Sequence, residues 1–212
     1  MKFTTTPGQA PLSGVMHGPI GPGAVHLCVD MQRLFSEDGP WPTPWMSRVL
    51  PVVGELARWS PERTIFTRYI PPAHPEEMPG RWQALYRHWR EVTRTHLDRV
   101  LLELLPELVR LVPPAAVLDK TRYSALSSPA MGQAPRAREA NCLVISGAET
   151  DVCIAATVLS AVDRGYRVIV VADAICSSSD PGHDAQLDLY NRRLALQNET
   201  ATAEQVLRNW RR

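Results

Sequence analysis

Three residues whose side chains could act together in catalysis stand at the ends of apolar runs. Asp30 follows the run AVHLCV, Lys120 closes AAVLDK, and Cys153 comes shortly after NCLVISG. A carboxylate can remove the proton of a thiol, and an ammonium group can balance the resulting charges. A cationic neighbour or a helix N-terminus also lowers the pKa of a cysteine thiol. The three side chains together predict a cysteine nucleophile that has its own base.

Each of these residues also has a purely structural interpretation. An aspartate after a strand can cap a turn, a lysine can lie on the surface, and a cysteine is most often a small buried hydrophobe. The chain has three more cysteines, none in a Cys-x-x-Cys pair, and we interpret them as packing residues: Cys28, Cys142 and Cys176. Residue spacing alone leaves catalysis and packing both open for Cys153.

The elements that must position these residues alternate between strands and helices. Five runs rich in Val, Ile and Leu predict strands buried on both faces of a parallel sheet: residues 24–31, 63–68, 115–120, 141–147 and 167–173. Between and after them, apolar residues at helical spacing predict helices at 44–59, 81–92, 97–111, 151–165, 183–198 and 202–210. This alternation indicates one α/β domain over residues 24–212, with helices on both faces of the sheet, after an irregular N-terminal arm at 1–23.

Several residues should shape the helices. We expect Pro51 to interrupt the first helix and Pro106 to break or kink the third, because proline lacks an N–H group and clashes with the preceding turn. Gly165 is placed to end a helix, and Thr202 with Gln205 has capping-box spacing.

The ligand of a doubly wound sheet lies beyond the carboxyl ends of its strands. Asp30 and Lys120 are predicted to lie at that edge, as is the turn before Cys153. If Thr150 or Asp151 is the N-cap of the following helix, Cys153 lies in its first turn. The unpaired N–H groups there could hold an oxyanion.

The composition excludes some function classes. The chain has 44% hydrophobic residues, 21% charged residues and a net charge of +1. This balance does not indicate binding to nucleic acid or to an acidic surface. No apolar run has membrane-spanning length, the N-terminus lacks a secretory core, and we expect a cytoplasmic location. The basic, aromatic segment 81–99 is interpreted as a core- or interface-packing stripe, whose tryptophans could line the mouth of the pocket or a subunit contact. No Gly-rich phosphate loop follows the first strand.

The chain resembles the isochorismatase-like cysteine hydrolases. The stretches that carry the resemblance follow family order from about Ala24 onward: VHLCVDMQRLF, TIFTRYIPP, VLDKTRYSAL, LVISGAETDVCIAATVLSAVDRGYRVIVVADAICSSS and HDAQLDLY. The resemblance implies a Rossmann-like, three-layer α/β/α fold with a six-stranded parallel sheet. It also implies a catalytic triad of Asp30, Lys120 and Cys153.

The same resemblance implies a cis peptide bond between Ala148 and Glu149. The backbone N–H groups of Glu149 and Cys153 would form the oxyanion hole. The side chains of Glu149 and Asp151 are interpreted as local caps or ion-pair partners.

Four residues are candidates for contact with the substrate. Phe35 stands where the family often has an aromatic wall, Gln32 lies beside the acid, and Tyr123 comes three residues after the lysine. Arg68 ends the second predicted strand and could pair with a substrate carboxylate.

Two differences from other branches of the family reduce the number of reactions to consider. Relatives of the nicotinamidase type bind a metal through Asp-x-His, but here that place reads TRYIPPAHPEEMPG, with His74 and no such element. We therefore predict no metal and no cofactor. A second branch cleaves the vinyl ether isochorismate, and its phenazine members lack the cysteine, so Cys153 favours amide chemistry.

These observations predict a hydrolase that cleaves an amide, ureide or carbamoyl C–N bond of a small molecule through a thioester. A vinyl-ether hydrolase and a non-catalytic binding protein on the same scaffold remain alternatives. We expect a homo-oligomer, either a dimer or a tetramer.

Overall fold

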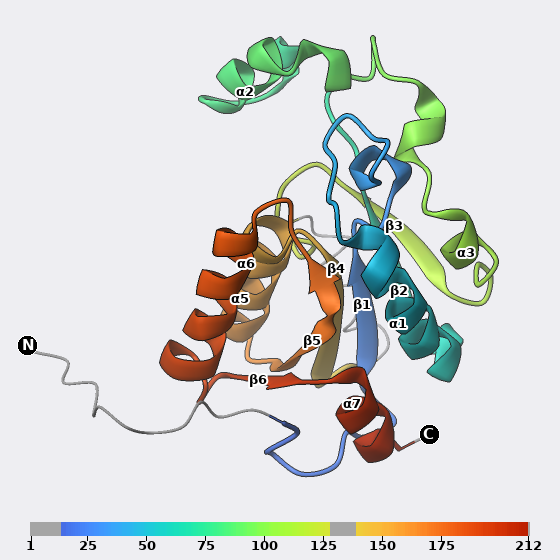
Figure 1. Cartoon of the computed structure of the whole chain (residues 1–212), viewed down its shortest axis with the longest axis vertical. Coiled ribbons are helices and arrows are strands. Elements are labelled where there is room, and N and C mark those ends of the chain that lie inside the picture. The colour runs from blue at the N-terminus through green and yellow to red at the C-terminus, as the bar shows by residue number, and fades with distance from the viewer. Residues whose placement is uncertain (1–13, 128–138, 212) are drawn as a thin grey trace, which may run out of the picture.

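The structure, a computed structural model, describes residues 14–127 and 139–211. Its centre is a six-stranded, all-parallel sheet with the strand order β3-β2-β1-β4-β5-β6 (Figure 1). The strands are β1 (Val25–Val29), β2 (Thr64–Tyr69), β3 (Ala116–Lys120), β4 (Cys142–Ala148), β5 (Arg167–Cys176) and β6 (Asn198–Ala201). The predicted fold class is confirmed, and the five strands predicted from apolar runs occur at their expected places.

The central strands are buried along their whole length, which explains their continuous apolar sequence. Every residue of β1 and β4 is buried. His26 is the polar exception in β1, and its ring lies 2.7 Å from the Ser146 hydroxyl of β4 and 3.3 Å from the Thr64 hydroxyl of β2. Burial lowers the pKa of His26 to about 3, so the imidazole that links these three strands is neutral.

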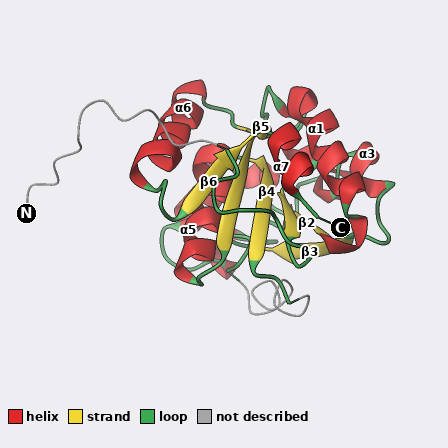
Figure 2. Ribbon diagram, turned by 90° about the horizontal axis from the view of Figure 1, so that it is seen from below, coloured by secondary structure: helices red, strands yellow, loops and turns green. Residues whose placement is uncertain are grey.

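Helices cover both faces of the sheet and complete three layers (Figures 1 and 2). One face packs against α1 (Met46–Trp59) and α7 (Ala203–Asn209). The other carries α5 (Ala155–Asp163), with α6 (Asp180–Asp188) beside it. Each face has its own apolar core, so the sheet separates two packed layers of side chains.

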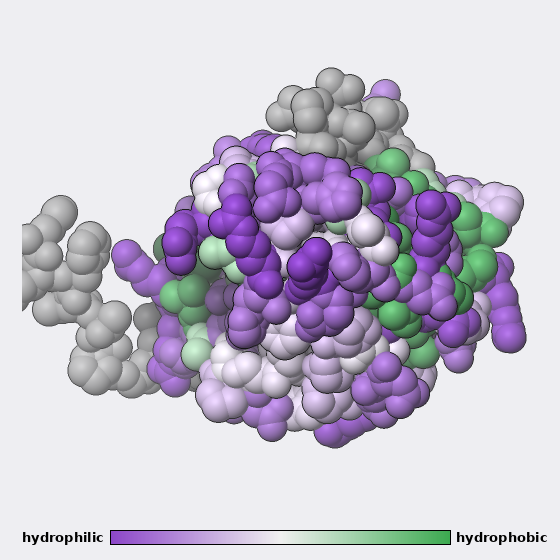
Figure 3. Space-filling model, turned by 90° about the horizontal axis from the view of Figure 1, so that it is seen from above, coloured by the Kyte–Doolittle hydropathy of each residue, from purple (hydrophilic) through white to green (hydrophobic). Residues whose placement is uncertain are grey.

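Most of the long connection between β2 and β3 lies beyond the carboxyl ends of the strands, and its last part, with α3 (Pro106–Val109), lies beside β3 (Figure 1). The connection also contains α2 (Trp82–His88), with short 3₁₀ helices at Pro75–Glu77, Arg90–Val92 and Arg99–Leu102. The outer surface at this end of the molecule is largely hydrophilic, and apolar groups gather toward one side (Figure 3).

For the helix predicted at 97–111, the break near Pro106 is confirmed, but the α-helix expected before it is wrong, because residues 99–102 form a short 3₁₀ helix. Pro106 is the first residue of α3, and Leu105 before it has an extended conformation, as residues before proline prefer. The backbone N–H of Leu105 donates to the carbonyl of Met31 at 3.0 Å, so the chain turns inward where a helix would continue.

Two further expectations about helices are also wrong. Pro51 lies inside a continuous α1, whose apolar face is buried and offsets the lost hydrogen bond. The helix predicted at 183–198 ends early: α6 is followed by a π-helical turn (Leu189–Arg193) and then by β6. The sequence of β6, NETA, is polar although all four residues are buried, so no apolar run marks it.

The predicted helix-end signals are confirmed. Gly165 follows α5 with a φ of +76°, and Thr202 and Gln205 form a capping box on α7.

The N-terminal segment packs on the sheet edge near β6. Residues 1–13 of the predicted arm lie outside the described residues, and residues 14–23 form no helix and no extended strand. Ile20 is fully buried and pairs with Trp210, while Glu199 accepts hydrogen bonds from the N–H groups of Met16 and His17. Within the described part of the chain, none of the helices has both the length and the apolar character needed to cross a bilayer.

Candidate active site

The candidate site lies where the strand order reverses, at the carboxyl ends of β1 and β4, with β3 two strands away from β1. Val29 at the end of β1 pairs with Gly147 near the end of β4. Gly147 has a φ of +113°, and a Cβ atom there would lie 2.0 Å from the carbonyl oxygen of Val29. Glycine is therefore required for the two strand ends to lie this close.

Asp30 directly follows β1 and is fully buried. Its Oδ2 atom lies 2.6 Å from Nζ of Lys120, and its Oδ1 atom accepts a hydrogen bond from the Thr67 hydroxyl at 2.7 Å. The backbone N–H of Asp30 donates to the same hydroxyl at 3.1 Å. Asp30 has a φ of +53°, a left-handed conformation that aspartate tolerates better than most residues. β1, β2 and β3 thus fix this carboxylate together.

Lys120 connects Asp30 to Cys153. Its Nζ atom donates to the carbonyl oxygen of Arg122 at 2.9 Å and lies 3.5 Å from Sγ of Cys153. It also lies 4.8 Å from the centre of the Tyr69 ring, a cation–π distance. Burial lowers the pKa of Lys120, but Asp30 and Cys153 raise it and the net shift is upward, so the ammonium group stays charged.

Cys153 is buried, with 6% of its surface exposed. Burial raises the pKa of its thiol, Lys120 lowers it, and the carboxylate of Asp30 raises it further. The net shift is upward, opposite to the lowering expected from the sequence, because burial and the carboxylate outweigh the ammonium group. The resting thiol therefore keeps its proton until a base removes it.

The turn that carries Cys153 is a π-helical turn, Thr150–Ile154, that leads into α5. Its N-cap is Glu149, so the expectation of Thr150 or Asp151 as N-cap is wrong by one or two residues. The peptide bond between Ala148 and Glu149 is cis.

One residue before α6 and one within it form hydrogen bonds with side chains of this turn. The Thr150 hydroxyl lies 2.9 Å from Nδ1 of His183, and the Ser177 hydroxyl donates to Asp151 at 2.6 Å. The ring of His183 also contacts Trp45 edge-on, with 5.4 Å between ring centres. Thr150 and Asp151 thus position the turn through their side chains although neither caps it.

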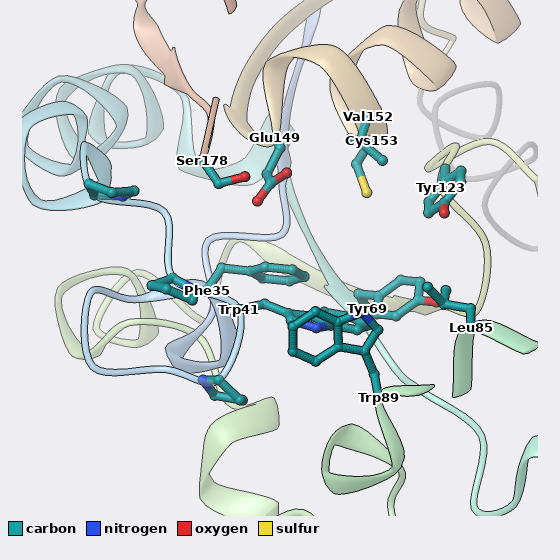
Figure 4. A pocket seen from close by; sticks show the side chains of 13 residues that line it. Phe35, Trp41, Tyr69, Leu85, Trp89, Tyr123, Glu149, Val152, Cys153 and Ser178 are labelled. Carbon is teal, nitrogen blue, oxygen red and sulfur yellow. The ribbon is translucent and has the colours of Figure 1, made fainter. Parts of the chain in front are cut away.

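A cavity of about 550 Å³ opens in front of Cys153. Figure 4 shows Sγ of Cys153 and the carboxylate of Glu149 pointing into it from one side. Four rings face them from the opposite side and form what we call the aromatic wall: Phe35, Trp41, Tyr69 and Trp89. The space holds a small molecule with its reacting bond near the sulfur.

The four rings of the aromatic wall contact one another around Trp41. The centre of the Trp41 ring lies 6.1 Å from that of Phe35, 6.3 Å from that of Tyr69 and 6.2 Å from that of Trp89. Such spacings are typical of aromatic pairs that stabilise each other.

Residues 24–205 of the chain match the isochorismatase domain. The chain belongs to the isochorismatase family. Its members are hydrolases, and the chain is accordingly a hydrolase. Over 187 residues, 87% of the chain and 84% of the relative, it is 29% identical to the phenazine biosynthesis protein PhzD1 of Pseudomonas aeruginosa. It is 32% identical to the uncharacterized isochorismatase family protein PncA of Bacillus subtilis over 71 residues, 34% of the chain and 39% of that protein.

Solved structures of the same family share the fold. A cysteine hydrolase from Pseudomonas syringae pv. phaseolicola has a TM-score of 0.79 at 23% identity, covering 94% of this chain and 97% of the other. N-carbamoylsarcosine amidase from Thermoplasma acidophilum has a TM-score of 0.68 at 22% identity, covering 85% and 96%. At these identities the likeness establishes the common architecture.

Two of the four predicted substrate contacts line the cavity of this isochorismatase-family chain. Phe35 belongs to the aromatic wall, and Tyr123 lies at the cavity with 41% of its surface exposed, 4.7 Å from the ring of Trp82. Both occupy positions from which a bound molecule can be contacted.

Gln32 and Arg68 do not line the cavity. Gln32 is fully buried, accepts the N–H of Tyr69 at 2.6 Å and donates to the carbonyls of Tyr69 and Leu102. Arg68 forms ion pairs with Asp119 at 2.8 Å and Glu103 at 2.9 Å. Their polar groups join segments of the fold, and contact of either side chain with substrate stays a prediction.

The sequence did not indicate Trp41, but it placed Trp89 in an aromatic stripe whose tryptophans could line the mouth of the pocket or a subunit contact, and Trp89 does line the cavity. Trp41 lies in a proline-rich loop, where no periodic pattern predicts which way a side chain points. Glu149, expected as a local cap or ion-pair residue, directs its carboxylate into the cavity and accepts a hydrogen bond from the Thr43 hydroxyl at 3.2 Å. Burial raises the pKa of this carboxyl group.

Potential metal ligands are dispersed across the described residues: no group of three or more His, Cys, Asp or Glu side chains there is close enough to hold an ion. His74 precedes the 3₁₀ helix Pro75–Glu77 and lines a different hollow from the cavity in front of Cys153.

Proposed function

We propose that this isochorismatase-family hydrolase cleaves an amide, ureide or carbamoyl C–N bond of a small molecule through a thioester on Cys153. One observation carries the proposal: Nζ of Lys120 lies 2.6 Å from the Asp30 carboxylate and 3.5 Å from Sγ of Cys153, and that sulfur faces the cavity. A thiol, a carboxylate and a fixed ammonium group are the parts that acyl transfer to a cysteine requires.

In the first half-reaction, Asp30 removes the proton from the thiol as sulfur attacks the substrate carbonyl. The carbonyl oxygen becomes an oxyanion, for which we propose the backbone N–H groups of Glu149 and Cys153 as donors. Asp30 then gives its proton to the leaving nitrogen, and the C–N bond breaks. Ammonia or an amine leaves, and an acyl thioester remains on Cys153.

In the second half-reaction, Asp30 removes a proton from water as the water oxygen attacks the thioester. The C–S bond breaks, the acid is released, and the sulfur recovers its proton from Asp30. Lys120 keeps its charge throughout, so the site never holds two uncompensated negative charges. The raised pKa of Cys153 suits this cycle, because the resting enzyme starts from a neutral thiol.

The relatives support this choice of bond. One structural relative is a cysteine hydrolase and another is an amidase that acts on N-carbamoylsarcosine. The cytoplasmic location and the homo-oligomer remain predictions from the sequence.

A second candidate is hydrolysis of a vinyl ether of the isochorismate type. The 29% identity to a phenazine biosynthesis protein over 87% of the chain favours it. That reaction would release pyruvate and would not need the thiol, so the two candidates differ in product and in their dependence on Cys153.

The test compares Cys153→Ala with Cys28→Ala across a panel of small amides, ureides and carbamoyl compounds. Both cysteines are buried, but Cys28 lies within β1 and does not line the cavity. We expect Cys153→Ala to fold and to lose ammonia release at least about a thousandfold, while Cys28→Ala retains it. Undiminished turnover by Cys153→Ala would overturn the proposal, and pyruvate release by that variant would establish the second candidate. Saturable binding with no turnover by the wild-type protein would instead indicate a binding protein.

A further inference from the structure

The cavity has an unusual charge balance. Among the described residues that line it, Glu149 is the one with a formal charge, and none is a lysine or an arginine. Figure 4 shows the Glu149 carboxylate pointing into the same space as Sγ of Cys153. A molecule that reacts at the sulfur therefore lies beside this carboxylate.

Glu149 has no cationic partner among the described residues. Its carboxylate accepts a hydrogen bond from the Thr43 hydroxyl at 3.2 Å, and Ser178 supplies another hydroxyl. Burial raises the pKa of Glu149, these two hydrogen bonds lower it, and the net shift is upward. A half-buried carboxylate without a counter-ion gains more than an exposed one when a cation binds to it.

The buried ammonium group of Lys120 does not compensate for this charge. Lys120 is 1% exposed, does not line the cavity and is paired with Asp30 at 2.6 Å. The Asp30–Lys120 pair is close to neutral, so Glu149 sets the sign of the potential in the cavity. A negative potential disfavours anionic molecules and concentrates cations.

The aromatic wall complements the carboxylate. Trp41 lies at its centre, with the rings of Phe35, Tyr69 and Trp89 around it at 6.1 to 6.3 Å. Indole and phenol faces attract cations, and several rings that face one carboxylate form a cage for an organic cation.

We propose that Glu149 and the aromatic wall select substrates that carry an organic cation, such as an alkylammonium or amidinium group, next to the scissile C–N bond. This inference rests on the proposed function for the reaction itself, but the cation site can be measured by binding alone. Glu149 thus has two separate roles: its side chain binds the cation, and its backbone N–H donates to the oxyanion.

The binding experiment uses Cys153→Ala and three matched amides in calorimetry. The probes are trimethylammonium-butanamide, its neutral isostere in which a tert-butyl group replaces the cation, and glutaramate, which carries a carboxylate instead. We expect the cationic amide to bind at least about tenfold tighter than the neutral one, and the anionic amide to bind weakest. Equal affinity for the cationic and neutral probes would overturn the inference.

A second substitution, added to Cys153→Ala, then tests which residue causes the preference for the cationic amide. Adding Glu149→Gln, which keeps the shape and the Thr43 hydrogen bond, should reduce the ratio of cationic to neutral affinity to within about threefold. The matched control adds Asp38→Asn instead, which removes one negative charge from the exposed part of the same loop that carries Trp41, and should keep the ratio. A ratio that survives Glu149→Gln would overturn the role of Glu149.

The wild-type enzyme separates this inference from the proposed function. Ammonia release that is faster for the cationic than for the neutral amide supports both. Equal kcat/KM for the two amides overturns the inference and leaves the proposed function standing. Selective binding by Cys153→Ala, without ammonia release by the wild-type protein, supports the cation site and contradicts the proposed function.

Discussion

The side of the cavity that carries Asp30, Lys120 and Cys153, here called the reactive side, is joined to hydrogen-bonded strands. The aromatic wall opposite is carried mainly by loops and short helices. Asp30 and Lys120 lie at or next to strand ends, and Cys153 follows β4 within one turn. Phe35 ends a 3₁₀ helix, Trp41 lies in a loop, and Trp89 is the C-cap that follows α2. In the wall, Tyr69 alone belongs to a strand.

This difference has a physical origin. The reactive side is positioned by strand pairing, which fixes Val29 against Gly147 and Tyr69 against Lys120. The aromatic wall is positioned by contacts among its own rings. Strand pairing is common to every member of a fold, whereas loops differ between members and carry specificity. We infer that the reactive side determines the chemistry and the aromatic wall determines the substrate.

Removing the charge of Lys120 should have the largest effect. Lys120→Met leaves the fully buried Asp30 without its counter-ion, and we expect a loss of unfolding free energy of about 3–5 kcal/mol together with loss of ammonia release. Urea unfolding and activity assays measure the two effects. Replacing both residues, Asp30→Leu with Lys120→Met, should restore part of the stability and none of the activity. A double variant less stable than Lys120→Met would show that the pair does not act as a unit.

Acid should destabilise the sheet through His26, which links β1 to β2 and β4. Its pKa is about 3 in the folded protein because of burial, against an ordinary value of about 6.5, so below pH 6.5 the unfolded chain binds a proton that the folded chain does not. The full contribution of neutral His26 is present above pH 6.5, and the unfolding free energy should fall by a few kcal/mol as pH decreases toward 3. Urea titrations across this range measure the slope, which His26→Gln should reduce. Replacing the exposed His17 by Gln is the control, and equal slopes for the two variants would contradict the role of His26.

A change in the aromatic wall should affect binding more than chemistry. Trp41→Ala removes the ring that contacts three others, so KM should rise about tenfold while kcat stays within about threefold of the wild-type value. Steady-state kinetics with one amide separates the two constants, and Trp41→Phe should recover part of the affinity. A loss of kcat as large as that in Lys120→Met would show that the wall takes part in the reaction.

The smallest effect is expected at Arg68. Its guanidinium pairs with two half-exposed carboxylates, Asp119 and Glu103, so Arg68→Ala should cost less than about 1 kcal/mol of unfolding free energy and leave kcat/KM unchanged. Thermal unfolding and kinetics with the anionic amide glutaramate measure both. A selective rise in KM for that amide would show that Arg68 reaches the substrate after all.

The difference between the reactive side and the aromatic wall also determined which site residues the sequence could predict. Strand ends are marked by apolar runs that stop at a polar residue, so the sequence alone places Asp30 and Lys120 at one edge of a parallel sheet. The apolar run that ends at Gly147 places the turn before Cys153 there as well, and the family resemblance added the cis peptide bond between Ala148 and Glu149. The direction of the Cys153 pKa shift could not be read this way, because it depends on how deeply the thiol is buried beside the carboxylate of Asp30.

The orientation of several polar and loop side chains could not be predicted, because it depends on contacts with residues far away in the sequence. Gln32 and Arg68 have the polar groups of a binding residue, yet both are used within the fold. Trp41 has no periodic neighbours that would assign it to a face. β6 was missed since a buried strand with the sequence NETA depends on Arg167 and the chain around it for its polar partners.

The central claim is that substrate is carried on the sulfur of Cys153. Rapid acid quench of the wild-type enzyme during turnover of an amide, followed by mass spectrometry of its peptides, tests it most directly. We expect an acyl group on the peptide that contains Cys153, attached as a thioester that hydroxylamine removes. Ammonia release at the full rate with the acyl group on a different residue would contradict the account.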